Sequence, residues 1–287
     1  MTSTRVSVQT NVRVDEERFA LIVTTRIGEV TATTAIHRQQ LFRRIGGIRF
    51  ATRGSVQEVA HLASAMTYKC GAALMPFDGE KSLVEVPGGI PISPAERARI
   101  VEMHLQDVTD CDAGATLGPD MYAGEDVMSL VGASPRWADF VTGRSVAAGG
   151  LGIDSNGATA LGLFAAFERL RSLGNIRLGT SSIQGFGAVG AELGLLLYRA
   201  GVVIRAISNA KGCLVALDER GLDLEELHSL RAACLSSNEV DLELQRYGAV
   251  RLAESRYYAD QPEQIYRIGC DMFVPAARTM VIALTSE

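Results

Sequence analysis

The hexapeptide Gly185-Phe186-Gly187-Ala188-Val189-Gly190 decides the fold, because it joins a short strand-like run to a helical pattern. Residues 180–184 form the strand-like run, apolar residues recur at helical spacing over 189–200, and residues 202–207 form a second strand of the buried type. In this β-α-β setting the first glycine makes a tight turn, the second lets the backbone approach a pyrophosphate, and the third lets the helix pack on the strand. The stretch therefore predicts a dinucleotide-binding unit; the alternative is a glycine turn that binds nothing.

The end of the second strand bears on which dinucleotide binds. An acidic residue there usually holds the ribose 2′-hydroxyl, but Ser208 and Asn209 occupy this place, with Arg205 and Lys211 nearby. Loss of the carboxylate removes repulsion against a 2′-phosphate, so the pattern favours NADP slightly over NAD, with Asn209 and Lys211 as cofactor-binding residues. The alternative is that the two basic residues are ordinary solvated charges.

Composition limits the other classes of function. The chain has 287 residues, 47% of them hydrophobic, and a formal net charge of −5. This length allows one large domain or two ordinary ones, and the acidic balance argues against a nucleic-acid partner. Five cysteines without a C-x-x-C pair and four isolated histidines indicate reduced thiols and no metal site. No secretory signal or apolar run of membrane-spanning length is present in the sequence, so we expect a cytoplasmic protein with no membrane partner.

The rest of the chain predicts a second region before the glycine loop. Strands are predicted at 19–25 and 30–36, and helices at 59–66, 94–105 and 158–173. Glycines cluster and apolar periodicity lapses around 144–152, so we place a domain boundary after residue 147. The expected fold class is α/β: an N-terminal α/β substrate domain over 1–147, followed by a Rossmann-type dinucleotide-binding domain over 148–287.

Short motifs in a fixed order indicate which kind of dinucleotide-binding protein the chain resembles. The N-terminal half contains Ala35-Ile36-His37, Ile45-Gly46-Gly47-Ile48-Arg49, Met66-Thr67-Tyr68-Lys69 and Gly79-Glu80-Lys81. Further along come Glu125-Asp126-Val127, Val141-Thr142-Gly143, Ala158-Thr159-Ala160 and Cys270-Asp271-x-x-Val274-Pro275-Ala276-Ala277. With these motifs the chain resembles, over nearly its whole length, the glutamate/leucine/phenylalanine/valine dehydrogenase family. The Met-Thr-x-Lys element with a second lysine twelve residues later is the specific part of the resemblance.

The resemblance implies an activity and a set of site residues. The activity is the NAD(P)-dependent, reversible oxidative deamination of an L-amino acid to its 2-oxo acid and ammonia. By motif position, Lys69 holds the substrate carboxylate, Lys81 is the catalytic lysine that activates water, and Asp126 shuttles protons to and from the amine. The remaining residues assigned in this way are Ile45, Gly46, Gly47 and Met66 for the substrate, and Thr159 and Ala276 for the cofactor.

The lysines can also be judged from helical spacing. Lys69 continues the apolar helical face of Leu62 and Met66, so its ammonium is expected to point inward. A buried ammonium needs an anionic partner or a lowered pKa. A substrate carboxylate meets the first need, and a catalytic lysine meets the second. The alternative for each lysine is a surface residue whose charged end reaches solvent.

Ile45 carries the expectation about the substrate. In the family that the chain resembles, the residue before the Gly-Gly pair lines the side-chain pocket, and a lysine there pairs with the γ-carboxylate of glutamate. An apolar pocket leaves that carboxylate unpaired, which costs several kcal/mol, on the order of a thousandfold in discrimination. We therefore expect an aliphatic or aromatic amino acid, as in the leucine/phenylalanine branch; the alternative is that Arg43 or Arg44 reaches the pocket.

Two departures from the family pattern leave other functions open. Asp78 and Glu80 flank Gly79 where the family is glycine-rich, and they either point to solvent or raise the pKa of Lys81, which is unfavourable for a base. The sequence ends soon after Ala277, which leaves half a doubly wound sheet, with strands near Thr180, Val202, Val250 and Met272. A homo-oligomer or a complementing partner chain is expected to cover such a sheet. The alternatives are a weakened nucleotide-binding homologue that needs or regulates a partner subunit, and a related imine or keto-acid reductase.

Overall fold

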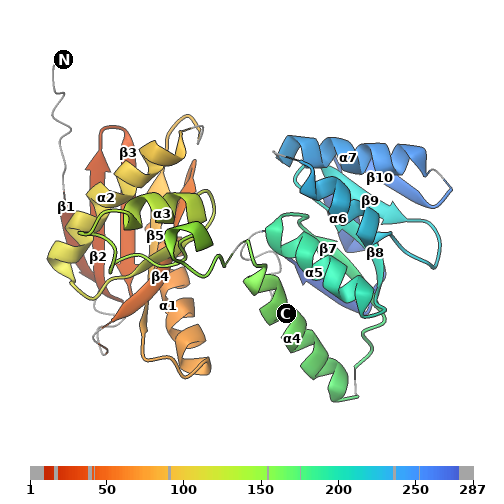
Figure 1. Cartoon of the computed structure of the whole chain (residues 1–287), viewed down its shortest axis with the longest axis horizontal. Coiled ribbons are helices and arrows are strands. Elements are labelled where there is room, and N and C mark those ends of the chain that lie inside the picture. Colours follow the sequence, from red (N-terminus) through yellow and green to blue (C-terminus); the bar gives the residue numbers. More distant parts are fainter. Residues whose placement is uncertain are drawn as a thin grey trace. The chain divides into compact units, whose positions relative to one another are not determined.

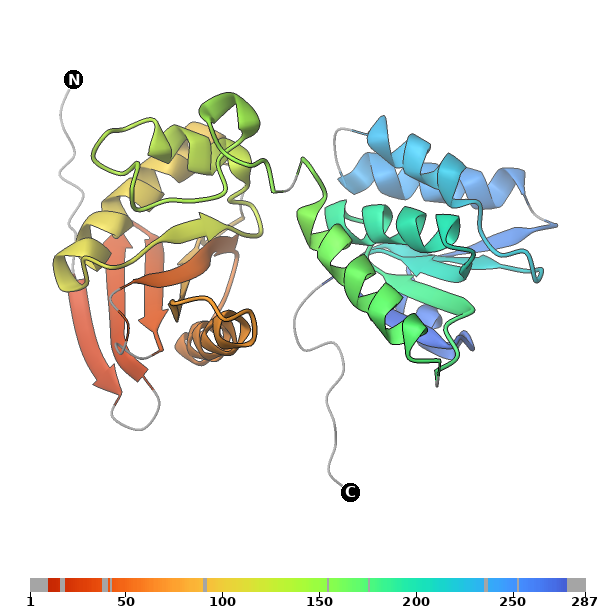
Figure 2. The ribbon, with the colours of Figure 1, turned by 60° about the horizontal axis from the view of Figure 1, so that its bottom comes forward.

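The computed structural model describes residues 10–15, 19–37, 41, 43–89, 92–153, 155–174, 176–234, 237–251 and 253–277. The chain divides into two compact units, Met1–Asn156 and Gly157–Glu287 (Figure 1, Figure 2). Each unit contains one β-sheet with helices packed on it, so the predicted α/β class is confirmed. The boundary proposed from the sequence lies slightly earlier, after residue 147.

A six-stranded mixed sheet forms the first unit, in the order β1-β2-β3-β5-β4-β6. Strands β4, β5 and β6 run parallel to one another, whereas β1, β2, β3 and β5 pair antiparallel. The strands are β1 (Thr10–Asp15), β2 (Phe19–Ile27), β3 (Val30–Ile36), β4 (Arg44–Ala51), β5 (Asp78–Glu85) and β6 (Leu117–Pro119). The helices are α1 (Val56–Ala72), α2 (Pro94–Cys111) and α3 (Glu125–Gly132).

Different helices cover the two faces of this sheet. Because successive strand residues point to opposite faces, Leu83 of β5 packs in a cluster with Val59 of α1, and Val84 packs with Val101 of α2. Odd-numbered residues of β5 therefore face α1, and even-numbered residues face α2. Glu80 and Lys81, adjacent in sequence, point to opposite faces of the sheet.

The start of α2 matches the sequence prediction. Pro94 occupies the first turn, and Ser93 and Glu96 form a reciprocal capping box, in which the Ser93 side chain accepts from the Glu96 N–H and the Glu96 side chain accepts from the Ser93 N–H. The helix continues to Cys111, beyond the predicted end near residue 105. Its buried face, which includes Leu105 and Val108, keeps helical spacing past that point.

A five-stranded sheet forms the second unit, in the order β10-β9-β8-β7-β11. Parallel β11, β7 and β8 build the Rossmann-type part, with β7, α5 and β8 as the predicted β-α-β unit. The strands are β7 (Thr180–Gln184), β8 (Val203–Ser208), β9 (Gly212–Ala216), β10 (Ser255–Ala259) and β11 (Met272–Pro275). The helices are α4 (Ala158–Ser172), α5 (Ala188–Arg199), α6 (Leu224–Ala232) and α7 (Ser237–Val250).

Two strands of this unit differ from the sequence prediction. Strand β9 was not predicted; it runs antiparallel to β8 because Asn209 Oδ1 accepts the N–H groups of Lys211 and Gly212 and turns the chain back. The strand predicted near Val250 is wrong, since Val250 ends helix α7 and the strand begins at Ser255. Apolar residues at Val240, Leu244 and Tyr247 pack at helical spacing against the core of the unit.

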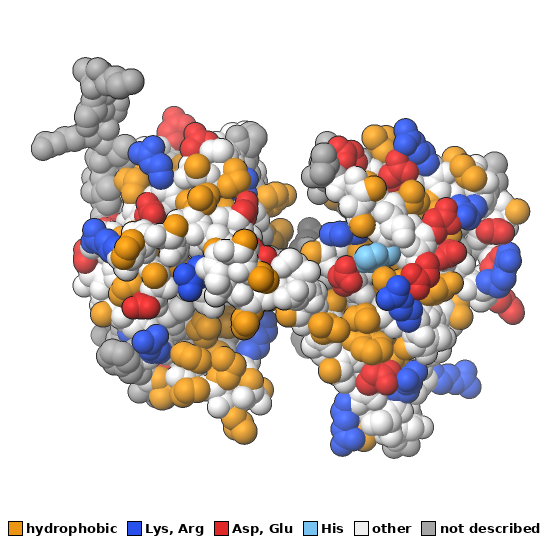
Figure 3. All heavy atoms as spheres, viewed as in Figure 1, with side chains coloured by type: hydrophobic (Ala, Val, Ile, Leu, Met, Phe, Trp, Pro, Cys, Tyr) orange, Lys and Arg blue, Asp and Glu red, His pale blue; other side chains and the backbone are white. Residues whose placement is uncertain are grey.

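Surface features of the described segments bear on partners. Helix α4 buries only Ala160 and Phe167, and its apolar side chains Leu161, Leu163 and Leu170 are exposed, as the group of hydrophobic side chains over α4 in Figure 3 illustrates. Among the described residues, no helix combines the length and the hydropathy needed to cross a bilayer. Within the same segments, no group of three or more His, Cys, Asp or Glu side chains is arranged to hold a metal ion.

Candidate functional site

Lys81 lies near the middle of the first sheet, on β5, and its residue is 8% exposed. Its ammonium donates a short hydrogen bond to Asp120 Oδ2. A Cβ added to Gly47, on the neighbouring strand β4, would lie 2.9 Å from Lys81 Nζ. The glycine at position 47 therefore leaves the room that the Lys81 ammonium occupies.

Asp120 holds two cations at once. Its Oδ2 also accepts from Arg49 Nε at 3.0 Å, and its Oδ1 accepts from the backbone N–H of Met121 at 2.8 Å. Arg49 Nη1 reaches Glu58 Oε1 on α1, at 3.1 Å. Lys81, Asp120, Arg49 and Glu58 therefore form one charged cluster, of which Glu58 is the most exposed member.

Burial and charge shift the proton affinities in this cluster. Burial lowers the pKa of Lys81, Asp120 opposes this shift, and the positive charges of Arg49 and Lys69 add to the lowering. Burial raises the pKa of Asp120, but its contacts with Lys81 and Arg49 outweigh burial and hold that pKa below its ordinary value. The cluster therefore contains a lysine that loses its proton more readily than a free lysine, beside a carboxylic acid that does the same relative to a free one.

The structure brings Asp120, not Asp126, to Lys81. Asp126 lies in the first turn of α3 and is exposed. Asp120 follows β6, which pairs in parallel with β4 through Gly46 and Gly47. Residues that follow neighbouring parallel strands meet at the same edge of a sheet, so an aspartate directly after the short strand at 117–119 was the available signal in the sequence.

The predicted substrate residues lie around this cluster in different ways. Lys69 is in the last turn of α1, and the prediction that it points inward is wrong, because the residue is exposed, although its charge acts on Lys81. Met66 and Ile45 are half-buried. Gly46 is buried against Glu80, where an added Cβ would lie 1.7 Å from the Glu80 carbonyl oxygen.

Arg43 and Arg44 were the alternative to an apolar pocket beside Ile45. Arg44 is buried, forms an ion pair with Asp112 and donates to the Leu41 carbonyl at 2.8 Å. Arg43 is exposed. The guanidinium of Arg44 is therefore committed to Asp112 in this structure.

Glu80 departs from both expectations for the acidic residues near Lys81. Neither Asp78 nor Glu80 points to solvent, since both are buried, and the pKa of Lys81 is lowered, not raised. Glu80 Oε1 accepts from the Thr116 N–H at 2.8 Å, and Oε2 has no hydrogen-bond partner within the described segments. Burial raises the pKa of Glu80 to about 7, against the opposing effects of the Thr116 N–H and Arg44.

This carboxyl group makes the stability of the first unit depend on pH. The pKa of Glu80 is higher in the folded chain, about 7, than its ordinary value of 4.5, so stability falls as pH rises from about 4.5 to 7. Glu80→Gln keeps the shape without the charge, and we expect it to raise the free energy of unfolding by up to about 3 kcal/mol above pH 7. Below about pH 4.5 the gain disappears.

Urea unfolding at pH 4.5 and pH 8, followed by circular dichroism, measures this difference. Glu29→Gln, at an exposed residue of the same unit, is the matched control and should change stability equally at both pH values. A Glu80→Gln gain of the same size at both pH values contradicts a titrating Glu80.

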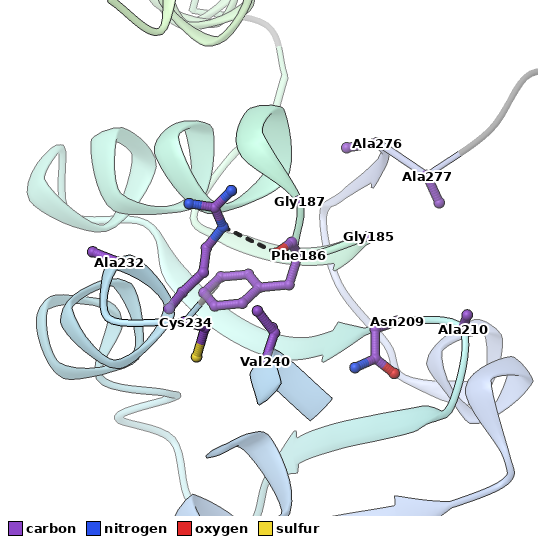
Figure 4. A pocket seen from close by; sticks show the side chains of 11 residues that line it. Gly185, Phe186, Gly187, Asn209, Ala210, Ala232, Cys234, Val240, Ala276 and Ala277 are labelled. Atoms are coloured by element: carbon purple, nitrogen blue, oxygen red, sulfur yellow. Dashed lines mark hydrogen bonds between the residues drawn. The ribbon is translucent and has the colours of Figure 1, made fainter. Parts of the chain in front are cut away.

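The glycine loop of the second unit lines a pocket of about 510 Å³ (Figure 4). Gly185 has a φ of +97°, and an added Cβ there would lie 2.7 Å from the Ala276 carbonyl oxygen. A Cβ on Gly190 would lie 1.9 Å from the Gly185 carbonyl oxygen, whereas one on Gly187 meets no atom within 4 Å. The pocket is lined by Gly185, Phe186, Gly187, Asn209, Ala210, Arg231, Ala232, Cys234, Val240, Ala276 and Ala277.

The loop has the space and the donors that a pyrophosphate needs. Gly187 directly precedes α5, whose first turn contains Ala188, Val189 and Gly190. The free N–H groups and the dipole at a helix N-terminus favour an anion. The open space beside Gly187 is where such an anion can approach the backbone, so the residues present fit a dinucleotide.

The residues around Asn209 place a carboxylate next to the pocket. Asn209 Nδ2 donates to Asp241 Oδ1 at 3.1 Å, and Tyr257 donates to the same oxygen at 2.5 Å. Lys211 is exposed and does not line the pocket, and Arg205 donates to the Asp218 carbonyl at 2.8 Å. The two basic residues singled out in the sequence are therefore not the ones that line the pocket.

Arg231 is a pocket residue that the sequence analysis missed. It lies in the last turn of α6, and its Nε donates to the Phe186 carbonyl at 3.3 Å. Nothing in the local sequence marks it, because the contact joins segments 45 residues apart. Of the other predicted cofactor residues, Ala276 lines the pocket, whereas Thr159 is exposed in the first turn of α4 and lies outside it.

Family models match both units of the chain. Residues 149–286 match the glutamate/leucine/phenylalanine/valine dehydrogenase model, and residues 12–134 match the model of the Glu/Leu/Phe/Val dehydrogenase dimerisation domain. The chain belongs to this family. The predicted fold class, an N-terminal α/β domain followed by a Rossmann-type domain, is confirmed.

Several curated relatives are glutamate dehydrogenases. The NAD-specific glutamate dehydrogenase of Staphylococcus aureus is 28% identical over 262 residues, covering 86% of this chain and 58% of that protein. The mitochondrial glutamate dehydrogenase of Dictyostelium discoideum is 27% identical over 280 residues, covering 87% and 51%. The chain therefore spans little more than half the length of these relatives.

Solved structures agree on the fold. The chain is similar to the hetero-hexameric glutamate dehydrogenase of Thermus thermophilus in its leucine-bound form, with a TM-score of 0.68, 24% identity, and coverage of 98% of this chain and 63% of that one. Against Plasmodium falciparum glutamate dehydrogenase the TM-score is 0.71 at 16% identity, with coverage of 96% and 57%.

Proposed function

We propose that the chain is an NAD-linked amino-acid dehydrogenase that interconverts an L-amino acid with its 2-oxo acid and ammonia. The observation that carries the proposal is the contact between buried Lys81 and half-buried Asp120, in which the pKa of the lysine is lowered. A lysine whose pKa is lowered, next to a carboxylate, suits acid–base chemistry at an amine-bearing carbon. Family membership supports the same reaction class.

The residues divide the proton transfers between them. A bound nicotinamide supplies the hydride acceptor. Lys81, in its neutral form, takes a proton from the water that attacks the imine carbon, and its ammonium polarises the carbonyl oxygen in the reverse direction. Asp120 carries protons to and from the amine, and so takes the role that the sequence analysis gave to Asp126. Lys69 is retained as the residue proposed to bind the substrate carboxylate.

NAD is the proposed cofactor, which replaces the slight preference for NADP. Relatives from Staphylococcus aureus and Bacillus subtilis are named NAD-specific. In this chain the Asp241 carboxylate lies behind Asn209, and Lys211 and Arg205 do not line the pocket. Negative charge near the ribose disfavours a 2′-phosphate. Arg231 adds positive charge beside the loop where the pyrophosphate is proposed to lie.

The proposed substrate is an L-amino acid with an aliphatic or aromatic side chain. Ile45 supplies no charge for a γ-carboxylate, and Arg44 is held by Asp112. The relatives named above are glutamate dehydrogenases, so the proposed substrate differs from the one in their names. Exposed apolar side chains on α4 favour an oligomer or a complementing subunit, and one similar structure is a hetero-hexamer.

The test is reduction of NAD and NADP by the purified protein across a panel of L-amino acids, followed at the nicotinamide absorbance. We expect turnover with leucine, valine or phenylalanine at least about a hundredfold above glutamate, because a desolvated apolar pocket leaves the γ-carboxylate unpaired. Ile45→Lys is the matched variant and should shift the preference toward glutamate. Bound NAD without turnover on any amino acid would favour instead a nucleotide-binding homologue that acts with a partner subunit.

A further inference from the structure

Arg49 contacts the same carboxylate oxygen as the proposed catalytic lysine. Its Nε donates to Asp120 Oδ2 at 3.0 Å, and Lys81 Nζ donates to that same oxygen. The Arg49 side chain is 12% exposed and the Lys81 side chain 10% exposed, so water screens neither contact well. One largely buried carboxylate thus holds two largely buried cations.

We propose that Arg49 is a positioning residue for the proposed reaction: it holds Asp120 in place and compensates its charge while Lys81 is neutral. This inference rests on the roles of Lys81 and Asp120 proposed above. It assigns to Arg49 a task that neither of those residues can perform alone.

The argument follows from what happens when Lys81 loses its proton. If Lys81 were the sole cationic partner, its deprotonation would leave a largely buried carboxylate without a compensating positive charge, which is costly. A guanidinium does not lose its proton in proteins, so the charge of Arg49 is permanent. Asp120 therefore keeps a cationic partner through both protonation states of Lys81, and the lysine can cycle between them.

The surroundings of Lys81 support this assignment from each packed element. Strand β4 contributes Arg49, helix α1 contributes Lys69 and Glu58, and the loop after β6 contributes Asp120. On β3 the residue paired with Lys81 is Ala35, which does not titrate. Glu80, the neighbour along β5, points to the opposite face of the sheet and so does not pair with Lys81.

Glu58 fixes the other end of the guanidinium. Arg49 Nη1 reaches Glu58 Oε1 at 3.1 Å while Nε reaches Asp120, so the planar fork spans two carboxylates. A lysine at this position keeps the charge but offers a single ammonium, which cannot reproduce a planar fork. Charge and geometry can therefore be separated by substitution.

The experiment compares Arg49→Met and Arg49→Lys with the wild type in two readouts. One is the pH dependence of acetylation of Lys81 by acetic anhydride, followed by mass spectrometry, which needs no turnover. The other is the pH profile of kcat/KM. For Arg49→Met we expect a higher pKa of Lys81, because a neighbouring positive charge is lost. The half-labelling point, which is the pH at which Lys81 is half acetylated, and the pH range over which kcat/KM rises should both move to higher pH. At pH 7 kcat/KM should be about tenfold lower.

Arg49→Lys separates the two parts of the role. We expect its labelling curve to stay close to that of the wild type, and its kcat to fall severalfold because Asp120 is less well held. Arg53→Met removes an exposed arginine shortly after the same strand, and it is the matched control that should move neither readout.

An unchanged half-labelling point in Arg49→Met overturns the proposal, and a fall in kcat without a shift in the pH profile assigns Arg49 a packing role instead. If Arg49→Met does not fold, wild-type kcat in Arg49→Lys overturns the proposal. Absence of turnover in the wild type counts against the proposed function alone, because the labelling curve still tests Arg49.

Discussion

Lys81→Ala is expected to lower kcat for amino-acid oxidation about 10³–10⁴-fold while NAD still binds. The loss is large because the ammonium that meets Asp120 is the group proposed to exchange the proton, and such general acid–base groups contribute at this scale. The pocket proposed to bind the nucleotide lies in the other unit, and all of its lining residues fall between Gly185 and Ala277. Lys81 is not among them, so its substitution should leave NAD binding intact. Stopped-flow turnover and isothermal titration with NAD measure the two effects separately.

A pair of aspartate substitutions sharpens this test. Asp120→Asn should cost about 10²–10³-fold in kcat, because the amide cannot take a proton from the amine. Asp126→Asn should change kcat by less than about threefold, since Asp126 is an exposed residue of the first turn of α3. The reverse ranking would restore the proton-shuttling role to Asp126, and wild-type turnover in Lys81→Ala would remove Lys81 from the mechanism.

The parts of the fold that local sequence specifies could be predicted. The three glycines at 185, 187 and 190 predicted a strand-to-helix turn, and the structure has that turn, with Gly190 in the first turn of α5. Backbone atoms lie within 3 Å of where a Cβ would stand on Gly185 or Gly190, so a side chain does not fit at either position. Pro94 after Ser93 marked the start of α2 for an equally local reason. These signals depend only on a few consecutive residues.

The parts that depend on contacts between distant segments could not be predicted. Asp120 meets Lys81 because β6 pairs with β4 at residues 46–48, a register that no local pattern reveals. Arg231 reaches the glycine loop from α6 for a similar reason. Lys69 was misjudged for a different reason: the side of α1 that the structure buries runs through Val59, Ala63 and Cys70, and Lys69 is exposed.

The alternation of β5 also explains why the acidic residues near Lys81 were misjudged. Proximity in sequence suggested that Glu80 would act on Lys81 directly. In a strand, adjacent side chains point to opposite faces. The pKa of Glu80 is therefore affected by Thr116 and Arg44, whereas the pKa of Lys81 is affected by Asp120 and Arg49. One strand therefore carries two perturbed groups whose environments are independent.

Alanine substitutions at Gly187 and Gly190 are expected to impair NAD binding for different reasons. A Cβ at position 190 would lie 1.9 Å from the Gly185 carbonyl oxygen, so the loop must open, which we expect to cost about 1–3 kcal/mol in stability and to abolish measurable NAD binding. A Cβ at position 187 meets no atom within 4 Å, and its backbone φ of −83° suits alanine, so the fold should keep its stability.

The Gly187→Ala variant is therefore the cleaner probe of the proposed cofactor site. Its methyl group projects where the pyrophosphate is proposed to approach the backbone, so we expect NAD affinity to fall on the order of tenfold or more at unchanged Tm. Gly162→Ala, in α4, also meets no atom within 4 Å and is the matched control that should leave NAD affinity unchanged. Wild-type affinity in Gly187→Ala would mean that the nucleotide does not bind against this loop. Equal losses in Gly187→Ala and Gly162→Ala would point to a general effect of the added methyl group.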